Sequence, residues 1–257
     1  MEAIYHPSNV TPAFQLDWGL TIFWRQSMIQ ESEWRADLAS ANESSGIRII
    51  KHRALDNETS QLFISTKPDV SPSEIIRGVK GRLQSLIRSS VPKAFQRNYC
   101  LRSIGSARRS VVEDYVASQL GHHQMADPRV QEMLQQFQLA YPEVDLSQPS
   151  RTAHGLYWYN LHLVFVNDGR WMETSESEIR KLCEMIEHVA FKGEHRLSRL
   201  SLLCDHVHLV IGCKIDQSPE DIALGFLNSG AIALGMKPQF KFGYYAGTTG
   251  EYDLGAV

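Results

Sequence analysis

The chain has 257 residues, 43% of them hydrophobic, and is long enough to bury the core of one large domain or of two domains of ordinary size. A net charge of −3 argues against a protein that coats nucleic acid by bulk positive charge, and no apolar run is long enough to span a membrane. The first residues lack a signal-peptide profile and the four cysteines have no CxxC spacing, so we expect a cytoplasmic protein with free thiols.

The apolar pattern predicts the same series of six elements twice. Each series reads strand, helix, strand, strand, helix, strand, which is the βαββαβ order of a ferredoxin-like antiparallel sheet backed by two helices. The predicted elements are 16–24, 31–44, 46–53, 59–66, 71–90 and 98–104 in the first series, and 156–166, 175–191, 196–203, 205–213, 218–235 and 242–249 in the second. The predicted fold class is therefore α+β, with two tandem ferredoxin-like domains.

Three pairs of segments match in the same order along the chain. They are 61–75 with 208–222 at an offset of 147, 99–105 with 244–250 at an offset of 145, and 18–24 with 159–165 at an offset of 141. Collinear matches of this kind indicate a tandem duplication. We therefore predict a pseudo-dimer that consists of a first domain at 12–140, a linker at 141–153 and a second domain at 154–257.

A strongly basic stretch runs from Arg77 to Arg109, where nine lysines and arginines occur without any Asp or Glu. Charge of a single sign over such a length is expected of a face that binds phosphate groups, and a solvated helix surface is the alternative. The residues expected to contact nucleic acid are Arg77, Lys80, Arg82, Arg88, Lys93 and Arg97.

A further helix is predicted at 110–123, directly after the first series. It carries Tyr115 and Gln119, and residues at i and i+4 share one face of a helix. A phenol would therefore lie beside an amide. By the offset between the halves, the counterpart of Tyr115 would fall after Val257, so we expect the second half to lack this helix.

A pair of histidines, His206 and His208, lies within a predicted strand of the second half. Side chains at i and i+2 on a strand point to the same face, and such a pair suits two ligands of one metal ion. Two solvated histidines are the alternative. At the offset of 147 the first half has Thr59 and Gln61 in their place, so no metal site is expected there.

These motifs together resemble the single-tyrosine HUH transposases of the insertion-sequence 200/605 type, which include the REP-associated tyrosine transposases. In that family a His-hydrophobic-His motif, usually preceded by Asp as at Asp205, binds a divalent metal. A Tyr-x-x-x-Gln helix supplies the nucleophile and a further ligand. The residues that follow Gln119, from Leu120 to His123, also resemble family sequences.

The resemblance implies an enzyme that cleaves and rejoins DNA. Tyr115 would be the catalytic nucleophile, and Mg²⁺ or Mn²⁺ would be held by His206, His208 and Gln119. The substrate would be single-stranded or hairpin DNA, and cleavage would leave a 5′-phosphotyrosine and a free 3′-hydroxyl group. Because the new phosphoester conserves bond energy, a 3′-hydroxyl could later attack it and rejoin strands.

Each half is incomplete by itself, since the first lacks the histidine pair and the second lacks the tyrosine helix. Members of the resembled family are homodimers whose active sites can be assembled between subunits. We therefore expect one composite site, with Tyr115 of the first half against His206 and His208 of the second. One site would act on two DNA ends in sequence, or two chains would associate.

Two other functions are open at this point. The chain is alternatively a catalytically silent, domesticated regulator that binds hairpin nucleic acid, or a metal phosphoesterase that uses water in place of tyrosine. The identity of the third ligand is open as well, because His122, His123 or Asp205 could replace Gln119. His162 is expected to be a satisfied core histidine, and an approach to the substrate is its alternative role.

Overall fold

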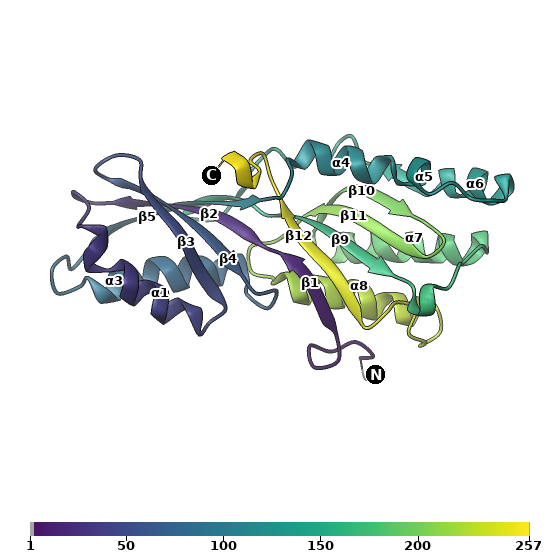
Figure 1. Ribbon diagram of the computed structural model, residues 1–257, viewed down its shortest axis with the longest axis horizontal. Helices are drawn as coiled ribbons and strands as arrows, with labels where there is room; N and C mark the ends of the chain where they lie inside the picture. Colours follow the sequence, from purple (N-terminus) through teal and green to yellow (C-terminus); the bar gives the residue numbers. More distant parts are fainter. Residues whose placement is uncertain (1–2, 257) are drawn as a thin grey trace.

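The computed structural model describes residues 3–256, which form two six-stranded sheets with helices packed against them (Figure 1). The strands are β1 (Thr11–Gln15), β2 (Asp17–Trp24), β3 (Ile47–Ala54), β4 (Thr59–Thr66), β5 (Phe95–Ile104), β6 (Gln138–Ala140), β7 (Ser150–Arg151), β8 (Gly155–Trp158), β9 (Asn160–Val166), β10 (Arg196–Leu202), β11 (His206–Gly212) and β12 (Gly243–Thr249). The α-helices are α1 (Arg35–Glu43), α2 (Pro72–Ile76), α3 (Arg82–Leu86), α4 (Arg109–Ala117), α5 (Gln119–His122), α6 (Pro128–Gln135), α7 (Glu176–Lys192) and α8 (Pro219–Ala233). The short helical segments are η1 (Glu31–Glu33), η2 (Arg77–Gly81), η3 (Asp168–Arg170) and η4 (Leu254–Ala256).

The first sheet has the order β3-β4-β2-β5-β8-β7 and the second has the order β1-β12-β9-β11-β10-β6. The predicted α+β class is confirmed, because both sheets are largely antiparallel and both are backed by helices. Within them, β3-β4-β2-β5 and β10-β11-β9-β12 are the strands of the two predicted series. The four strands of each series are arranged in the same order.

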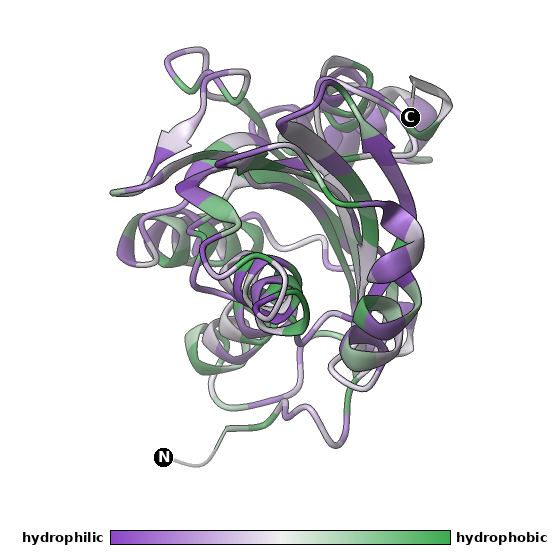
Figure 2. Ribbon diagram, turned by 90° about the vertical axis from the view of Figure 1, so that its left-hand side faces the viewer, coloured by the Kyte–Doolittle hydropathy of each residue, from purple (hydrophilic) through white to green (hydrophobic). Residues whose placement is uncertain are grey.

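Burial along the strands reflects what covers each sheet. In β4 buried residues alternate with half-buried ones, which is expected when only one face packs against helices. Every residue of β11, its counterpart in the second sheet, is buried. In Figure 1 α7 and α8 lie on one side of the second sheet and α4 on the other. Apolar segments, green in Figure 2, occur along the strands and within the helices.

Several element boundaries differ from the prediction. The expected strand at 156–166 is interrupted at Tyr159, and β8 and β9 on either side of it belong to different sheets. The expected helix at 71–90 ends at Leu86 and contains a π-helical segment, η2. The alternation of polar and apolar residues continues across the break at Tyr159, so periodicity alone could not locate it.

The two halves are joined by a reciprocal exchange of strands. β1 directly precedes β2 of the first sheet but pairs in parallel with β12 of the second. In the same way β8 directly precedes β9 of the second sheet but pairs in parallel with β5 of the first. Each half therefore adds one strand to the sheet of the other, next to the last strand of that half's series.

Hydrogen bonds between the halves also occur in equivalent pairs. They are Ser73 N to Ile215 O and Glu220 N to Pro68 O, both 2.9 Å, and Ser103 Oγ to Thr249 O (2.7 Å) and Thr248 Oγ1 to Ile104 O (2.6 Å). The offsets of 147 and 145 found in the sequence relate the members of each pair. Self-complementary contacts of this kind are those of a two-fold interface.

The predicted division at 12–140, 141–153 and 154–257 follows the sequence and stays a prediction. In space, the ranges 12–140 and 154–257 each contribute strands to both sheets, and β7, in the range 141–153, lies in the first sheet. The helices α4 to α6 and the strand β6 follow the first series, yet β6 pairs with β10 and α4 packs against β10 and β11. None of the helices in the described residues is both long and apolar enough to cross a bilayer.

Gly250 lies where the chain crosses β5 at the contact between the halves, and its replacement by alanine is expected to destabilise the protein by about 2 to 3 kcal/mol. A Cβ atom there would lie 2.1 Å from the carbonyl oxygen of Ser103, so the two backbones would have to separate. Urea denaturation measures the effect. At Gly225, in α8, an added Cβ atom would have no neighbour within 4 Å, and Gly225→Ala should instead stabilise slightly. Equal effects of the two changes would contradict the close approach at Gly250.

Candidate active site and metal centre

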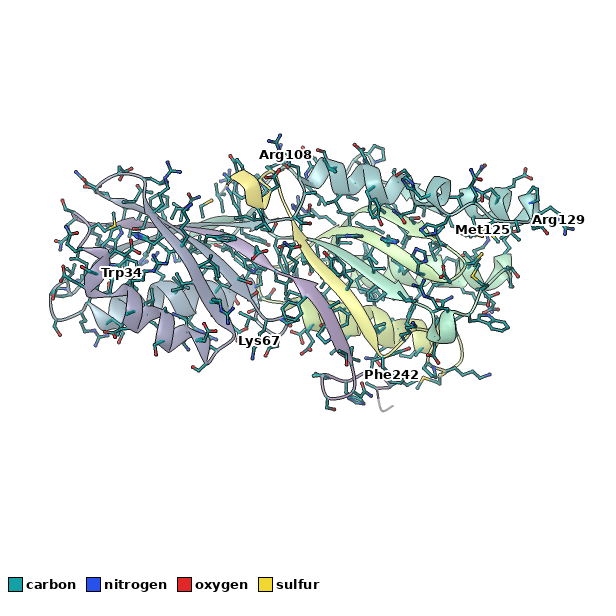
Figure 3. The ribbon with its side chains drawn as sticks, in the orientation of Figure 1. Trp34, Lys67, Arg108, Met125, Arg129 and Phe242 are labelled. Atoms are coloured by element: carbon teal, nitrogen blue, oxygen red, sulfur yellow. The ribbon has the colours of Figure 1, made fainter. Side chains whose placement is uncertain are left out.

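The helix that carries Tyr115 lies over the second sheet (Figure 1). In Figure 3 Arg108 and Met125 label the two ends of the α4–α5 segment. Val116 is fully buried and packs with Leu146 and Val210, which lies on β11. The helix α4, which follows the first half and carries Tyr115, therefore packs against β11, the strand that carries the histidine pair.

A buried ionic network fixes the start of α4. Arg109 donates to Glu113 and, over 2.8 Å, to Glu251, and Ser198 on β10 donates to Glu113. Although burial opposes it, the Glu251 and Glu113 carboxylates raise the pKa of Arg109. The carboxylate of Glu113 is almost completely buried, so it depends on these donors for compensation.

Replacement of Arg109 by methionine is expected to loosen α4 from the second sheet. The change keeps much of the apolar volume but leaves the Glu113 carboxylate buried without its cation, which costs about 3 kcal/mol. Hydrogen exchange should accelerate in α4 and remain unchanged in α7, which does not depend on this network. Unchanged exchange in α4 would show that the network does not hold the helix.

The two histidines of β11 are buried side by side, with ring centroids 5.0 Å apart. The ring of Tyr115 lies 5.8 Å from that of His208 and 6.2 Å from that of His162. Tyr115 itself is 47% exposed, although its ring lies edge-on to the imidazoles of His162 and His208. The structure thus brings Tyr115, His206 and His208 together.

Gln119 lies close to Tyr115, on the next helical segment. The predicted helix at 110–123 is divided at Ser118 into α4 and α5, and Gln119 is the first residue of α5. Its side chain is 1% exposed, and its Nε2 donates to the carbonyl oxygen of Tyr115 over 3.1 Å. Its Oε1 is buried without any hydrogen-bond partner. A buried amide oxygen without a partner is costly, and a bound cation would satisfy it.

Both histidines of the pair have one ring nitrogen engaged by a neighbour. Nδ1 of His206 lies 2.6 Å from Oδ1 of Asp205, and Nδ1 of His208 lies 3.0 Å from Nε2 of His162. If both Nδ1 atoms donate, both Nε2 atoms keep a free lone pair. Metal-binding histidines in proteins typically donate their second nitrogen to such an acceptor, which sets the ring orientation.

The electrostatic surroundings favour neutral imidazoles. Burial, together with the nearby His162 and His206, lowers the pKa of His208 to about 2, and burial lowers that of His162 to about 4. Although burial opposes it, hydrogen bonds from His206 and Arg170 lower the pKa of Asp205. The neutral imidazole is the form that binds metals, and an ionised carboxylate is the acceptor that supports it.

The donors available for a divalent ion are therefore Nε2 of His206, Nε2 of His208 and Oε1 of Gln119. Within residues 3–256 no three His, Cys, Asp or Glu side chains are grouped as a metal site. The unpartnered Oε1 of Gln119 is therefore the candidate third donor. The ring of His123 lies 5.1 Å from that of His206 and is the nearest alternative.

His162 is largely buried and hydrogen-bonded to His208, as a satisfied core histidine would be, and it lies beside the histidine pair. Its direct contact with His208 was not predicted. It lies on β9 directly opposite Val210, which has the same strand parity as His208. That parity is a sequence signal, but it becomes visible only when the register of the two strands is known.

The six basic residues predicted to bind nucleic acid are not gathered with the histidines. They belong to η2, α3, β5 and the loop between α3 and β5, at the opposite end of the molecule from α5 (Figure 1). Lys80 donates to the carbonyl oxygens of Arg97 and Asn98, and Arg82 donates to Asn42 and Ser45. Burial lowers the pKa of Lys80 to about 8. The exposed members are Arg77, Arg88, Lys93 and Arg97.

One family model matches part of the chain. Residues 25–119 match the family model described as "Transposase IS200 like", a segment that ends at Gln119. No curated protein matches the chain.

Two solved structures have distant similarity. One is described as a "putative transposase" from Deinococcus radiodurans R1, is 14% identical and has a TM-score of 0.33 over 42% of this chain and 92% of that chain. The other is described as a "putative glycine cleavage system transcriptional repressor", is 11% identical and has a TM-score of 0.23 over 86% and 92%. Neither similarity is close enough to support an argument. The family match over residues 25–119 confirms the resemblance of this part of the chain to the IS200-like transposases.

Proposed function

We propose that the protein is a metal-dependent single-strand DNA endonuclease and strand transferase, a transposase that recognises hairpin DNA and forms a 5′-phosphotyrosine intermediate. One observation carries the proposal. Tyr115 from the first half lies against His208 from the second, and Gln119, which is hydrogen-bonded to the Tyr115 backbone, has a buried Oε1 without a partner. The family match supports DNA as the substrate.

We further propose that the chain is a tandem duplication of a ferredoxin-like unit that forms a pseudo-dimer. The identical order of the four strands in the two series supports this, as do the reciprocal strand exchange and the paired hydrogen bonds. In such a pseudo-dimer one composite site per chain follows from the positions of the tyrosine helix and the histidine pair.

The proposed reaction is an in-line displacement at phosphorus. Oη of Tyr115 forms a bond to the phosphorus atom while the bond to the 3′ oxygen breaks. The phenol proton is released to solvent, and the 3′ oxygen takes up a proton. The products are a 5′-phosphotyrosine and a 3′-hydroxyl group, and attack by a 3′-hydroxyl on the phosphotyrosine reverses the step and joins strands.

Each residue of the site has a defined task in this proposal. The docked α4 helix holds the Tyr115 ring at the edge of the buried imidazoles, which limits the directions from which the phenol can attack. His206, His208 and Gln119 would hold the divalent ion, which supplies positive charge against the scissile phosphate. Asp205 and His162 keep the two imidazoles in the required tautomer and orientation.

Incubation with DNA tests the proposal. Single-stranded hairpin DNAs from the flanks of the protein's own gene are incubated with the chain and Mn²⁺ or Mg²⁺, and products are separated on a denaturing gel. A covalent protein–DNA adduct with a free 3′-hydroxyl fragment is expected. Cleavage without an adduct would assign the attack to water. Tight binding without cleavage would favour the alternative, a catalytically silent regulator that binds hairpin nucleic acid.

A further inference from the structure

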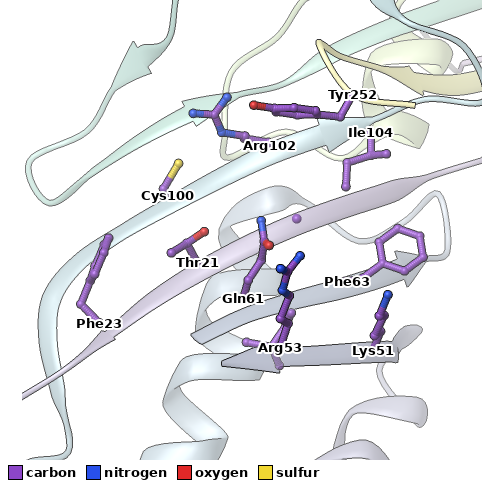
Figure 4. A pocket seen from close by; sticks show the side chains of 12 residues that line it. Thr21, Phe23, Lys51, Arg53, Gln61, Phe63, Cys100, Arg102, Ile104 and Tyr252 are labelled. Carbon is purple, nitrogen blue, oxygen red and sulfur yellow. The ribbon is translucent and has the colours of Figure 1, made fainter. Parts of the chain in front are cut away.

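The first sheet has one face that no helix covers within residues 3–256. The helices α1 and α3 pack on one side of it (Figure 1). The opposite side carries a cavity of about 480 Å³, whose lining side chains are drawn in Figure 4. The alternating burial of β4 is consistent with this one-sided cover. In the second sheet the corresponding face is occupied by α4.

Strand register identifies this cavity as the counterpart of the candidate active site. Gln61 lies opposite Thr21 in the first sheet, as His208 lies opposite Val164 in the second. Gln61 and Thr21 both line the cavity. In the second sheet this face carries the histidine pair. In the first sheet the equivalent face has no such histidines and carries the open cavity.

The lining of the cavity is cationic and aromatic. Its charged residues are Lys51, Arg53 and Arg102, and no Asp or Glu is among the described residues that line it. Its aromatic residues are Phe23, Phe63 and Tyr252. Figure 4 shows Arg53 and Gln61 rising from the sheet, with Arg102 and Tyr252 across the hollow from them.

Arg102 is held in place by aromatic rings. Its guanidinium carbon lies 3.8 Å from the ring centroid of Trp158, on the exchanged strand β8, and 5.9 Å from that of Tyr252. A guanidinium that stacks on a ring keeps its N–H groups available at its edge. The strand exchange between the halves thus helps to build this cavity.

We propose that this cavity is a second site for single-stranded DNA, which binds the strand without cleaving it. Arginine and lysine side chains pair with phosphates, and aromatic rings on an open antiparallel sheet stack on unpaired bases. The bases of a duplex are stacked on one another, so a duplex could contact the arginine and lysine side chains but not stack on the aromatic rings. The aromatic lining therefore favours a single strand. The site goes beyond the proposed cleavage function and does not require it.

Fluorescence anisotropy with a labelled oligothymidylate of about 12 nucleotides tests this site. The full chain is used as the Tyr115→Phe variant in EDTA, so that neither cleavage nor a metal ion contributes to the signal. Addition of Arg53→Gln should weaken binding about 10-fold and reduce the slope of log Kd against log salt by about 0.7. Addition of Phe63→Leu, which keeps an apolar side chain but removes the ring, should weaken binding about 10-fold without changing the slope.

The matched control is Arg129→Gln in the same background, because Arg129 is an exposed arginine on α6, at the far end of the molecule (Figure 3). It should leave affinity and salt slope unchanged. Equal effects of the three changes, or no effect of Arg53→Gln and Phe63→Leu, would overturn the proposed site. The covalent-adduct assay on otherwise unchanged protein is independent of this result, so failure of the second site and failure of the cleavage proposal are distinguishable.

Discussion

Replacement of Tyr115 by phenylalanine is expected to abolish the covalent protein–DNA adduct and to lower the cleavage rate by at least about 1,000-fold. The change removes only the nucleophilic oxygen, and loss of the nucleophile from other covalent enzymes has effects of this size or larger. Because Tyr115 is 47% exposed and its hydroxyl has no described structural role, the free energy of unfolding should stay close to that of the wild type. Single-turnover cleavage on denaturing gels measures the loss.

Tyr252→Phe is the matched control. Tyr252 is also a half-exposed tyrosine, but it lines the cavity on the first sheet, away from the histidine pair. Its replacement should leave adduct formation unchanged, and the retained ring should still stack in the proposed DNA-binding cavity. An adduct that persists in Tyr115→Phe and disappears in Tyr252→Phe would show that Tyr115 is not the nucleophile.

His208→Ala is expected to eliminate metal-dependent cleavage and to lower the affinity for Mn²⁺ by more than about 100-fold. Outer partners of metal ligands contribute about 10- to 100-fold, so removal of a direct ligand should cost more. The change also removes the partner of His162, whose Nε2 lies 3.0 Å from His208 Nδ1. Isothermal titration calorimetry measures the affinity, and the gel assay measures cleavage.

His188→Ala controls for nonspecific metal binding by imidazole, because His188 is an exposed residue of α7. It should bind Mn²⁺ and cleave DNA as the unchanged protein does. Full cleavage by His208→Ala in the presence of Mn²⁺ would remove His208 from the metal site and contradict the proposed ligand set.

Much of the secondary structure could be predicted because its signals are local. The Ser71-Pro72 and Ser218-Pro219 pairs begin α2 and α8, and both serines form capping boxes in the structure. β4 is predicted with the bounds it has, and β11 to within one residue at each end. Such features depend on side-chain periodicity and capping within a few residues of the chain.

The strand exchange could not be predicted in the same way. Leu16 and Tyr159 are both fully buried, so the apolar pattern runs on through the points where the chain passes from one sheet to the other. Pairing of β1 with β12 joins residues more than 200 positions apart, and no local rule specifies such a contact. The expected strand at 16–24 therefore missed β1, which lies directly before it.

The candidate site was predictable as far as sequence spacing determines geometry. Tyr115 and Gln119 could be assigned to one helical segment, and His206 and His208 to one strand face. The first half has the tyrosine helix and the second half has the histidine pair. This complementarity suggested that Tyr115 would lie against His208. The contacts of His162 and the unpartnered Oε1 of Gln119 depend on packing between distant elements, and they became visible only in the structure.

Metal binding by a matched pair of glutamine variants tests most directly whether one site is built from both halves. Gln119→Met and Gln61→Met each replace an amide by an apolar side chain of similar length, and only Gln119 is hydrogen-bonded to Tyr115, whose ring lies against His208. We expect calorimetry to give one Mn²⁺ per chain for the unchanged protein and for Gln61→Met, and a large loss of affinity for Gln119→Met. Unchanged Mn²⁺ binding by Gln119→Met, or two ions per chain in the unchanged protein, would contradict a single composite site.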